Sequence, residues 1–401
     1  MTSTLFAQVE RAPRDPILGL TESFNADTRA DKVNLGVGVY YDDNGKLPLL
    51  KCIKDAEAKR VASAPARGYQ PIEGAAAYNQ SVQTLLFGAS SQILAEQKVI
   101  TIEALGGTGA LKVGADYLRR LIPKAKVAIS DPSWENHRAL FEMAGFEVVN
   151  YRYYDSSSRG LDFEGMIKSI EALPAGTILV LHACCHNPTG VDLSDAQWAQ
   201  VIATIQSKGH VPFLDMAYQG FGDGIDADAS ALRAFVASGL SFLVSSSFSK
   251  SFSLYGERVG ALSIVTQSAD EASRVLSQVK RTIRTNYSNP PTHGGAVVAM
   301  VLSTPELRAT WEAELAQMRD RIKAMRQGLV DGLKAEGLKA DFGFVTSQRG
   351  MFSYTGLIEK QVDRLRDEFG VYAVGTGRIC IAALNSGNLG RVCKAIAAVA
   401  A

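Results

Sequence analysis

Short apolar runs alternate with longer mixed segments through the middle of the chain. The runs lie at residues 98–105, 127–130, 178–184, 211–214 and 242–246. Continuous apolar runs of this length predict buried strands, and the segments between them are long enough for helices. We therefore expect an α/β fold with a mostly parallel sheet flanked by helices. Because ligands bind at the carboxyl ends of the strands in such sheets, the polar residues that follow each run form the candidate site.

After about residue 300, apolar positions recur at three- and four-residue steps, which is the period of an amphipathic helix. This pattern predicts one long helix that begins near Pro305. A shorter strand-and-helix region follows to the end of the chain. The repeating positions of the helix are Leu307, Trp311, Leu315, Met318, Ile322, Met325, Leu329 and Leu333.

The remaining organisation indicates two domains. Residues 1–30 are polar, contain Pro13 and Pro16, and are typical of an arm. A chain of 401 residues is long enough for a large domain and a smaller one. We predict an N-terminal arm with part of the small domain at residues 1–46, a large domain at residues 47–304, and a small C-terminal α+β domain at residues 305–401.

Composition narrows the class of protein. The chain is 46% hydrophobic and 21% charged, with a formal net charge of +1, which is typical of a globular protein without a nucleic-acid footprint. No apolar run approaches the length of a membrane span, and the first residues lack the basic start and apolar core of a signal peptide. Five cysteines without framework spacing fit reduced thiols. We expect a cytoplasmic protein that binds neither nucleic acid nor membrane.

The most informative segment joins the last apolar run to a serine cluster and one lysine. It reads SSSFSK and ends at Lys250, and Arg258 follows eight residues later. A lysine is costly to bury unless it has a task, such as forming a Schiff base with an aldehyde cofactor. Ser247, Ser249 and Arg258 could then bind a phosphate group on that cofactor. The alternative is a strand that ends in a solvated lysine.

Two other strand ends carry glycines and an aromatic residue. The first run is followed by the sequence GGTG, which contains Gly107 and Thr108, and then by a helix. Backbone N–H groups at such a helix start favour an anion, but the sequence matches neither the dinucleotide pattern GxGxxG nor a P-loop. Trp134 follows the second run, and it could stack on a flat ring or be a core residue.

The third run leads into the sequence HACCHNPTG at residues 182–190, which holds four potential metal ligands. Its spacing argues against zinc, because structural zinc pairs usually have two to four residues between ligands. Adjacent Cys184 and Cys185 on a strand would also point to opposite faces. We therefore expect no metal. Asn187 lies in a turn that could present its amide to a bound ring, and the alternative is a plain Asx-type turn.

Asp215 follows the buried run at residues 211–214, where a carboxylate is costly unless it is paired. A protonated pyridine nitrogen would be such a partner and would keep the ring an electron sink. Tyr218 could then reach a ring hydroxyl, whereas the alternative role of Asp215 is a helix N-cap. Arg378 heads a short apolar strand, and its planar fork suits a carboxylate. The alternative for Arg378 is an ordinary surface salt bridge.

Together these segments resemble the class I aminotransferases of fold type I, in particular the aspartate and aromatic (tyrosine) subgroup, from Asp15 to the C-terminal helix. The motifs that carry the resemblance are VNLGVGVY at 33–40, CCHNPTG at 184–190, DMAYQG at 215–220, SFSK at 247–250, NYSNPP at 286–291 and RGMFS at 349–353. The resemblance implies a mostly parallel seven-stranded sheet flanked by helices, a smaller α+β domain, and pyridoxal 5′-phosphate (PLP) as cofactor.

The same resemblance implies a role for each position. Lys250 would form the Schiff base and later move the substrate proton, Asp215 would pair with the pyridinium, and Arg378 would clamp the α-carboxylate. Tyr69 would reach the phosphate of the other subunit and Arg284 would cross the interface to a side-chain carboxylate, so a homodimer with shared active sites is implied. The other implied positions are Asn187 and Tyr218 at the ring oxygen, Trp134 on the ring, Gly107, Thr108, Ser247, Ser249 and Arg258 at the phosphate, and Gly38 close over the substrate.

Substrate choice depends on fewer residues. Arg284 favours aspartate, glutamate and their oxo acids, and Thr108 and Asn289 are similar to the aspartate enzymes. Tyr41 and Leu47 are similar to the aromatic subgroup. We expect ping-pong transfer of the amino group between L-aspartate or aromatic L-amino acids (tyrosine, phenylalanine) and 2-oxoglutarate.

Three other functions stay open at this point. A PLP-dependent decarboxylase or β-lyase would also keep Lys250 and Asp215, although Arg284 together with Arg378 favours a dicarboxylate substrate. A non-catalytic binding protein on the same fold would not need Lys250. A nicotinamide dehydrogenase would carry the dinucleotide fingerprint, which the sequence lacks.

Overall fold

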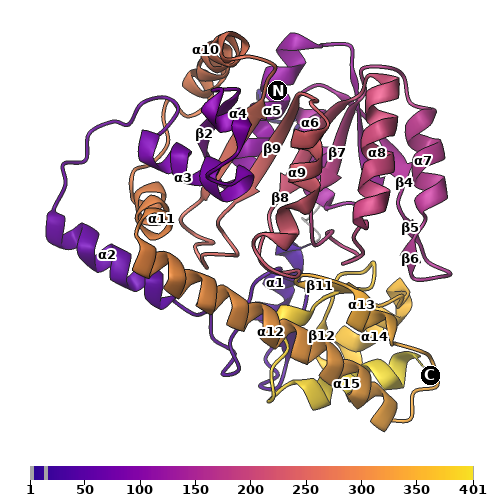
Figure 1. The fold of residues 1–401 in the computed structure, drawn as a ribbon. Helices are drawn as coiled ribbons and strands as arrows, with labels where there is room; N and C mark the ends of the chain where they lie inside the picture. The colour runs from indigo at the N-terminus through magenta and orange to yellow at the C-terminus, as the bar shows by residue number, and fades with distance from the viewer. Residues whose placement is uncertain (1–3, 13–16, 401) are drawn as a thin grey trace.

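A computed structural model of the chain describes residues 4–12 and 17–400. At its centre is a seven-stranded sheet with helices on both faces (Figure 1). The prediction of an α/β fold around such a sheet is confirmed. The strand order is β2 (Val99–Leu105), β10 (Val259–Val265), β9 (Phe242–Ser247), β8 (Val211–Met216), β7 (Ile178–His182), β3 (Lys126–Asp131) and β4 (Glu147–Arg152).

The direction of the strands collects their ends at one edge of the sheet. Strands β9, β8, β7, β3 and β4 pair in parallel, whereas β10 runs antiparallel to both of its neighbours, β2 and β9. The carboxyl ends of the other strands and the amino end of β10 therefore lie at the same edge. Sequence analysis did not identify β4 or β10 as strands. The consequence is that Arg258, directly before β10, joins the residues that follow the parallel strands.

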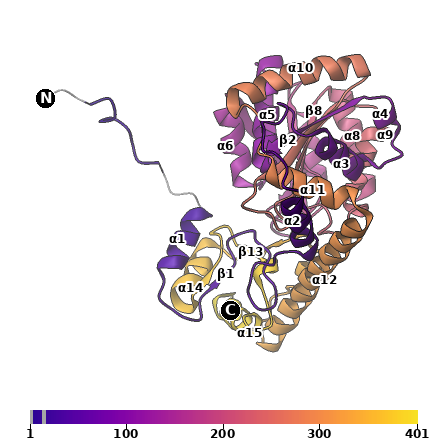
Figure 2. The same cartoon turned by 90° about the vertical axis from the view of Figure 1, so that its left-hand side faces the viewer.

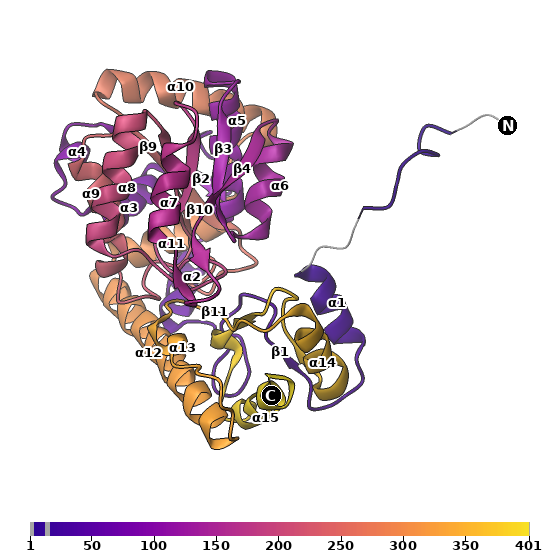
Figure 3. The same cartoon turned by 90° about the vertical axis from the view of Figure 1, so that its right-hand side faces the viewer.

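Two helical layers cover the sheet (Figures 1 and 3). Gly114 of α5 faces the sheet, because a Cβ there would come within 2.5 Å of the Phe213 ring. Leu121, the last residue of α5, is 61% exposed. The layers are α5 (Gly106–Leu121), α6 (Glu135–Met143) and α10 (Ala269–Asn286) on one face, and α3 (Ala76–Phe87), α7 (Phe163–Glu171), α8 (Asp195–Lys208), α9 (Ser230–Ala237) and α11 (His293–Ser303) on the other.

The long helix predicted near Pro305 is present as α12 (Pro305–Ala335), which runs from the large α/β part to a smaller part (Figure 1). The predicted apolar positions are buried, apart from Met325, which is partly buried. Trp311 on α12 donates from Nε1 to the carbonyl of Ser251 at 2.7 Å and stacks on Phe252 with ring centroids 4.5 Å apart. The helix therefore supports the turn that carries Lys250.

Residues from both ends of the chain build the smaller part. Strand β1 (Val33–Asn34) pairs in parallel with β12 (Val371–Tyr372), and β11 (Phe352–Tyr354) pairs antiparallel with β13 (Arg378–Cys380). Helices α1 (Leu18–Ala26), α14 (Glu359–Phe369) and α15 (Leu389–Ala400) pack around these strands (Figures 1 and 2). The remaining elements are α2 (Lys51–Ser63), α4 (Gln92–Ala95), β5 (Tyr154–Asp155), β6 (Gly160–Leu161), α13 (Phe344–Ser347) and the 3₁₀ turns η1 (Ala227–Ala229) and η2 (Ile381–Ala383).

The N-terminal segment was expected to be an arm. Residues 4–12 lie away from the rest of the molecule (Figures 2 and 3), and the side chains of Leu5, Phe6 and Val9 are exposed. Pro13, Asp15 and Pro16, which sequence analysis also used, lie outside the described residues. Among the described residues, no helix combines the length and the apolar character needed to cross a membrane.

Candidate functional site

One cavity lies at the carboxyl edge of the sheet, where the strand ends face β11 and β13 of the smaller part. The predicted site residues line it, with the exception of Tyr69 and Arg284. Those lining it are Gly38, Gly107, Thr108, Trp134, Asn187, Asp215, Tyr218, Ser247, Ser249, Lys250, Arg258 and Arg378. Residues without a predicted role also line it, namely Ile17, Leu111, His182, Cys184, Ala217 and Phe352.

Lys250 lies in a turn directly after β9, and its Nζ is 5.0 Å from the centroid of the Tyr218 ring. Burial lowers the pKa of Lys250 to about 8, and the opposing attraction of Asp215 is the weaker influence. A lysine of ordinary pKa is almost entirely an ammonium at neutral pH, which cannot attack a carbonyl. Lys250 therefore has the free-amine character that a Schiff-base lysine needs.

Asp215 lies in β8 with its carboxylate held by a histidine. His137 on α6 donates from Nε2 to Asp215 Oδ2 at 2.8 Å, and both side chains are buried. Burial acts to raise the pKa of Asp215, but the hydrogen bond from His137 and the nearby cationic groups outweigh it, so this pKa is lowered. The group stays ionised and can accept a hydrogen bond from a cationic ring nitrogen. Because Asp215 is within a strand, the N-cap alternative is wrong.

A chain of side chains connects Asp215 to the turn that carries Asn187. His137 Nδ1 lies 3.0 Å from Ser133 Oγ, which lies 3.5 Å from His182 Nε2. His182 Nδ1 in turn accepts from the backbone N–H of Asn187 at 3.1 Å. Burial lowers the pKa of His182 to about 3, so this ring is neutral and can accept. The histidines thus fix the Asp215 carboxylate relative to the Asn187 amide.

The start of α5 and the residues after β9 form one end of the cavity, where several hydrogen-bond donors gather. Gly106 has φ +69° as the first residue of α5, and a Cβ there would come within 2.5 Å of Arg258 Nη2. Arg258 Nη1 donates to the carbonyl of Tyr255 at 3.0 Å and to Ser249 Oγ at 3.4 Å. The N–H groups of the first helical turn lack partners within the helix. Backbone donors, hydroxyl groups and a guanidinium therefore converge, which suits a phosphate.

Arg378, at the start of β13, carries a buried guanidinium with an unused donor. It is 1% exposed, and its Nη1 and Nη2 donate to Asn187 Oδ1 at 3.1 Å and to the carbonyl of Gly36 at 2.7 Å. Its Nε is buried and has no hydrogen-bond partner among the described residues. The carboxylate of Glu135 lies 4.0 Å away, and the guanidinium sits 4.4 Å from the centroid of the Phe352 ring. A buried cation with an unpaired N–H favours an incoming carboxylate.

Tyr69 and Arg284 are not brought to the cavity of their own chain. Tyr69 is 95% exposed in the loop before α3. Arg284 is exposed in the last turn of α10, where its Nη1 donates to Ser288 Oγ. Neither side chain can act in the site formed by the same chain in this arrangement.

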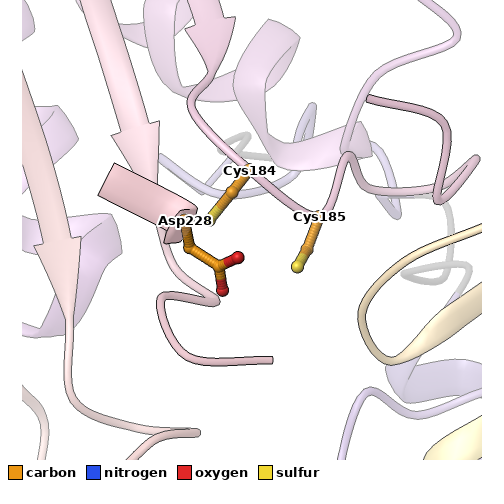
Figure 4. Close-up of side chains that lie close together, drawn as sticks. All are labelled: Cys184, Cys185 and Asp228. Carbon is orange, nitrogen blue, oxygen red and sulfur yellow. The ribbon is translucent and has the colours of Figure 1, made fainter. Parts of the chain in front are cut away.

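Two thiols and a carboxylate lie close together (Figure 4), and one of the thiols, that of Cys184, belongs to a residue that lines the cavity. The ligand atoms of Cys184, Cys185 and Asp228 lie within 4.8 Å of one another. The prediction that the two cysteines point to opposite faces is wrong, because β7 ends at His182 and Cys185 has φ +51°. A hydrogen bond with Cys185 acts to lower the pKa of Cys184, but burial raises it to about 11.

The carboxylate in this cluster already has donors. Asp228 accepts backbone N–H groups from Gly220, Gly222 and Asp223 at 2.8–2.9 Å. The hydrogen bond with Cys184 and burial raise the pKa of Cys185. Protonated thiols are poor metal ligands. These features favour a structural role, in which Asp228 holds the loop after Tyr218.

Comparison with known proteins assigns the chain to a family. The sequence model of the family "Aminotransferase class I and II" matches residues 30–396. Aspartate aminotransferase of Pseudomonas aeruginosa is 66% identical over 396 residues, which cover 99% of this chain and 100% of that protein. Aromatic-amino-acid aminotransferase of Escherichia coli is 51% identical over 396 residues, which cover 98% of this chain and 100% of that protein. A crystal structure of aromatic-amino-acid aminotransferase from Burkholderia pseudomallei, covalently bound to pyridoxal phosphate, is 67% identical, covers 99% of this chain and 100% of its own, and superposes with a TM-score of 0.97. The chain therefore belongs to the class I and II aminotransferases.

Proposed function

We propose that this chain is a PLP-dependent transaminase that moves the amino group between L-aspartate or the aromatic L-amino acids tyrosine and phenylalanine and 2-oxoglutarate. One observation carries the proposal. A buried lysine amine of lowered pKa and a buried carboxylate kept ionised by His137 line the same cavity, and hydrogen-bond donors gather at one end of it. This combination suits a cofactor with an aldehyde, a basic ring nitrogen and a phosphate.

The residues present fit PLP. The buried carboxylate of Asp215 lines the cavity and accepts a hydrogen bond from His137, and a pyridinium would supply it with a second, cationic donor. When bound, PLP supplies an aldehyde for Schiff-base formation and a ring that withdraws electrons from the substrate Cα. The residues that would hold it are Lys250 at the aldehyde, Asp215 at the ring nitrogen, Asn187 and Tyr218 at the ring oxygen, Trp134 on the ring face, and Gly107, Thr108, Ser247, Ser249 and Arg258 at the phosphate.

The chain's own residues then bind and deprotonate the amino acid. Arg378, which lines the cavity and has no hydrogen-bond partner for its Nε among the described residues, would bind the substrate α-carboxylate and so orient the Cα–H bond. Lys250 Nζ, with its lowered pKa, would take the proton from that Cα and, as a general acid, would deliver it to the carbon that carries the aldehyde in free PLP. Burial raises the pKa of Tyr218, so its phenol stays protonated and donates. Phe352 and the other apolar walls exclude water from the reacting atoms.

We further propose that the active unit is a homodimer with shared sites. The exposed positions of Tyr69 and Arg284, away from their own cavity, support a role in the neighbouring subunit. The test mixes a Lys250→Ala chain with an Arg284→Ala chain. Each mixed dimer should regain one site with Lys250 from one chain and Arg284 from the other. Aspartate activity that stayed at the level of the two parents would contradict the shared site.

Specificity for both substrate classes is the finer part of the proposal. A relative named for aspartate and others named for aromatic amino acids have high identity to this chain, which supports a site that accepts both. The direct test is to measure kcat/KM for aspartate, tyrosine and phenylalanine with 2-oxoglutarate. Release of carbon dioxide or β-elimination in place of 2-oxo-acid formation would instead identify a decarboxylase or a β-lyase.

Two coarser features accompany this proposal. We propose the division into an arm and part of the small domain (1–46), a large domain (47–304) and a small domain (305–401), which the β1–β12 pairing and the start of α12 support. A cytoplasmic location also stays a prediction, and the five cysteines, which are buried and free, are consistent with it.

A further inference from the structure

A buried glutamate in β2 has no part in the mechanism described above. Glu103 is 2% exposed and lies three residues before the Gly106 turn. Two glycines leave room for its carboxylate, because a Cβ at Gly74 would lie 2.8 Å from Oε2 and a Cβ at Gly295 would lie 2.1 Å from Oε1. The chain therefore encloses this carboxylate closely.

Glu103 is bonded to two segments that are distant in the sequence. Gln70 Nε2 donates to Glu103 Oε2 at 3.3 Å and to the carbonyl of Pro291 at 2.8 Å. The backbone of Glu103 completes the connection, because its carbonyl accepts from Tyr287 Oη at 3.2 Å and its N–H donates to the carbonyl of Glu73 at 2.9 Å. One residue thus joins the loop before α3 to the segment after α10.

The two residues that do not line the cavity of their own chain lie in or beside these segments: Tyr69 in the loop before α3, and Arg284 in the last turn of α10, directly before the second segment. Gln70 directly follows Tyr69, and Tyr287 comes three residues after Arg284. Tyr69 is exposed, and the hydrogen bond that Arg284 donates to Ser288 Oγ lies within the same stretch of chain, so this bond does not tie Arg284 to the rest of the molecule. Their positions depend on how the backbone beside them is anchored. Glu103 with Gln70 is one anchor that the two segments share, and the ion pair between Lys280 of α10 and Glu73 is another.

We propose that Glu103, acting through Gln70, is a positioning residue that sets Tyr69 and Arg284 for the neighbouring subunit's site and so determines the affinity for dicarboxylate substrates. This inference rests on the proposed function. Burial raises the pKa of Glu103 to about 7, although hydrogen bonds from Gln70 and from a backbone N–H act to lower it. An ionised carboxylate is therefore costly at this position. An apolar side chain would avoid that cost, which indicates a role in hydrogen bonding.

The test compares Gln70→Ala, Glu103→Leu and the double variant by steady-state kinetics with aspartate and with phenylalanine. We expect the aspartate KM to rise about tenfold in each, because a displaced Arg284 loses a charge-assisted bond to the second carboxylate. Phenylalanine has no second carboxylate, so its KM should stay within about twofold. The double variant should be no worse than the more affected single variant, since both remove the same connection.

Two controls separate positioning from folding. Gln83→Ala also removes a hydrogen bond to β2, from Nε2 to the carbonyl of Val99, but far from the two segments, so it should leave the aspartate KM unchanged. Glu103→Gln keeps the size and an acceptor oxygen and should restore most of the aspartate affinity lost in Glu103→Leu. Gln70 is only partly buried, so its alanine variant should fold even if Glu103→Leu does not.

The outcomes distinguish the inference from the proposed function. An equal rise in KM for aspartate and phenylalanine in the variants, or an unchanged aspartate KM in Gln70→Ala, would overturn the positioning role. Neither result would contradict the proposed transaminase activity of the wild type. A wild-type protein that did not transaminate aspartate would remove the proposed function, and this inference with it.

Discussion

Replacing Glu103 by glutamine should change how the stability of the protein depends on pH. Burial raises the pKa of this carboxyl from an ordinary value of 4.5 to about 7 in the folded chain. Below the ordinary value both states hold the proton, and between the two values only the folded state holds it. The free energy of unfolding therefore falls as pH rises through this window and is level above it.

The magnitude follows from the two pKa values. Their difference corresponds to a total loss of about 3 kcal/mol in the free energy of unfolding as pH rises. About 2.5 kcal/mol of this loss occurs between about pH 5 and about pH 8. The phenols of Tyr78 and Tyr287 face the same carboxyl, but burial raises their pKa values, so they stay neutral throughout. Glu103→Gln has no proton to lose. Its free energy of unfolding should thus decline about 2.5 kcal/mol less than that of the wild type across this range.

Urea unfolding of the holoenzyme at fixed protein concentration, repeated across this pH range, measures the difference. The pKa of Asp192 is also raised, to about 6, but this residue is present in both proteins and its contribution cancels. Glu164→Gln is the matched control. The side chain of Glu164 is 89% exposed, so its carboxyl should have a similar pKa in the folded and unfolded protein, and this substitution should leave the pH profile unchanged. Parallel pH profiles for the wild type and Glu103→Gln would refute the reasoning about burial.

Two other predictions concern the carboxylate clamps and the histidine behind Asp215. Arg284→Leu should lower kcat/KM for aspartate about a hundredfold or more, with little change in kcat/KM for phenylalanine. Arg378→Leu should lower kcat/KM for both substrates. Arg281 is an exposed neighbour on α10, and Arg281→Leu should leave both kcat/KM values unchanged. Equal losses for both substrates in Arg284→Leu would contradict this division. His137→Phe removes the donor to Asp215, so PLP affinity measured by equilibrium dialysis should fall about tenfold, since one charge-assisted hydrogen bond is worth about 1.5–3 kcal/mol. Unchanged PLP affinity would mean that His137 does not hold the carboxylate.

The sequence predicted the parts of the site that follow directly from strand ends. Lys250 and Asp215 are polar residues at the ends of apolar runs, where local burial alone makes them unusual. His137 was missed because its partner Asp215 is far away in the sequence, although its spacing of four residues from Ser133, which precedes α6, was a usable signal. Phe352 was likewise quoted within a motif without a role, because its contact with Arg378 forms only when β11 pairs with β13.

Other misses came from treating a run of residues as regular structure. Cys184 and Cys185 were assigned to the strand that includes His182, but the chain turns directly after that residue. The apolar run in β10 was not predicted as a strand, although it directly follows Arg258, the predicted phosphate ligand. In both cases the secondary structure depends on tertiary contacts, because these determine where the chain turns to join the neighbouring layer.

The central claim is that the Lys250 amine is the point of attachment for PLP. Reduction of the purified holoenzyme with borohydride, followed by digestion and mass spectrometry, tests it directly. We predict a single phosphopyridoxyl group on the peptide that contains Lys250, and loss of both this group and the transamination of aspartate in Lys250→Ala. A phosphopyridoxyl group on another lysine, or wild-type turnover in Lys250→Ala, would contradict the account.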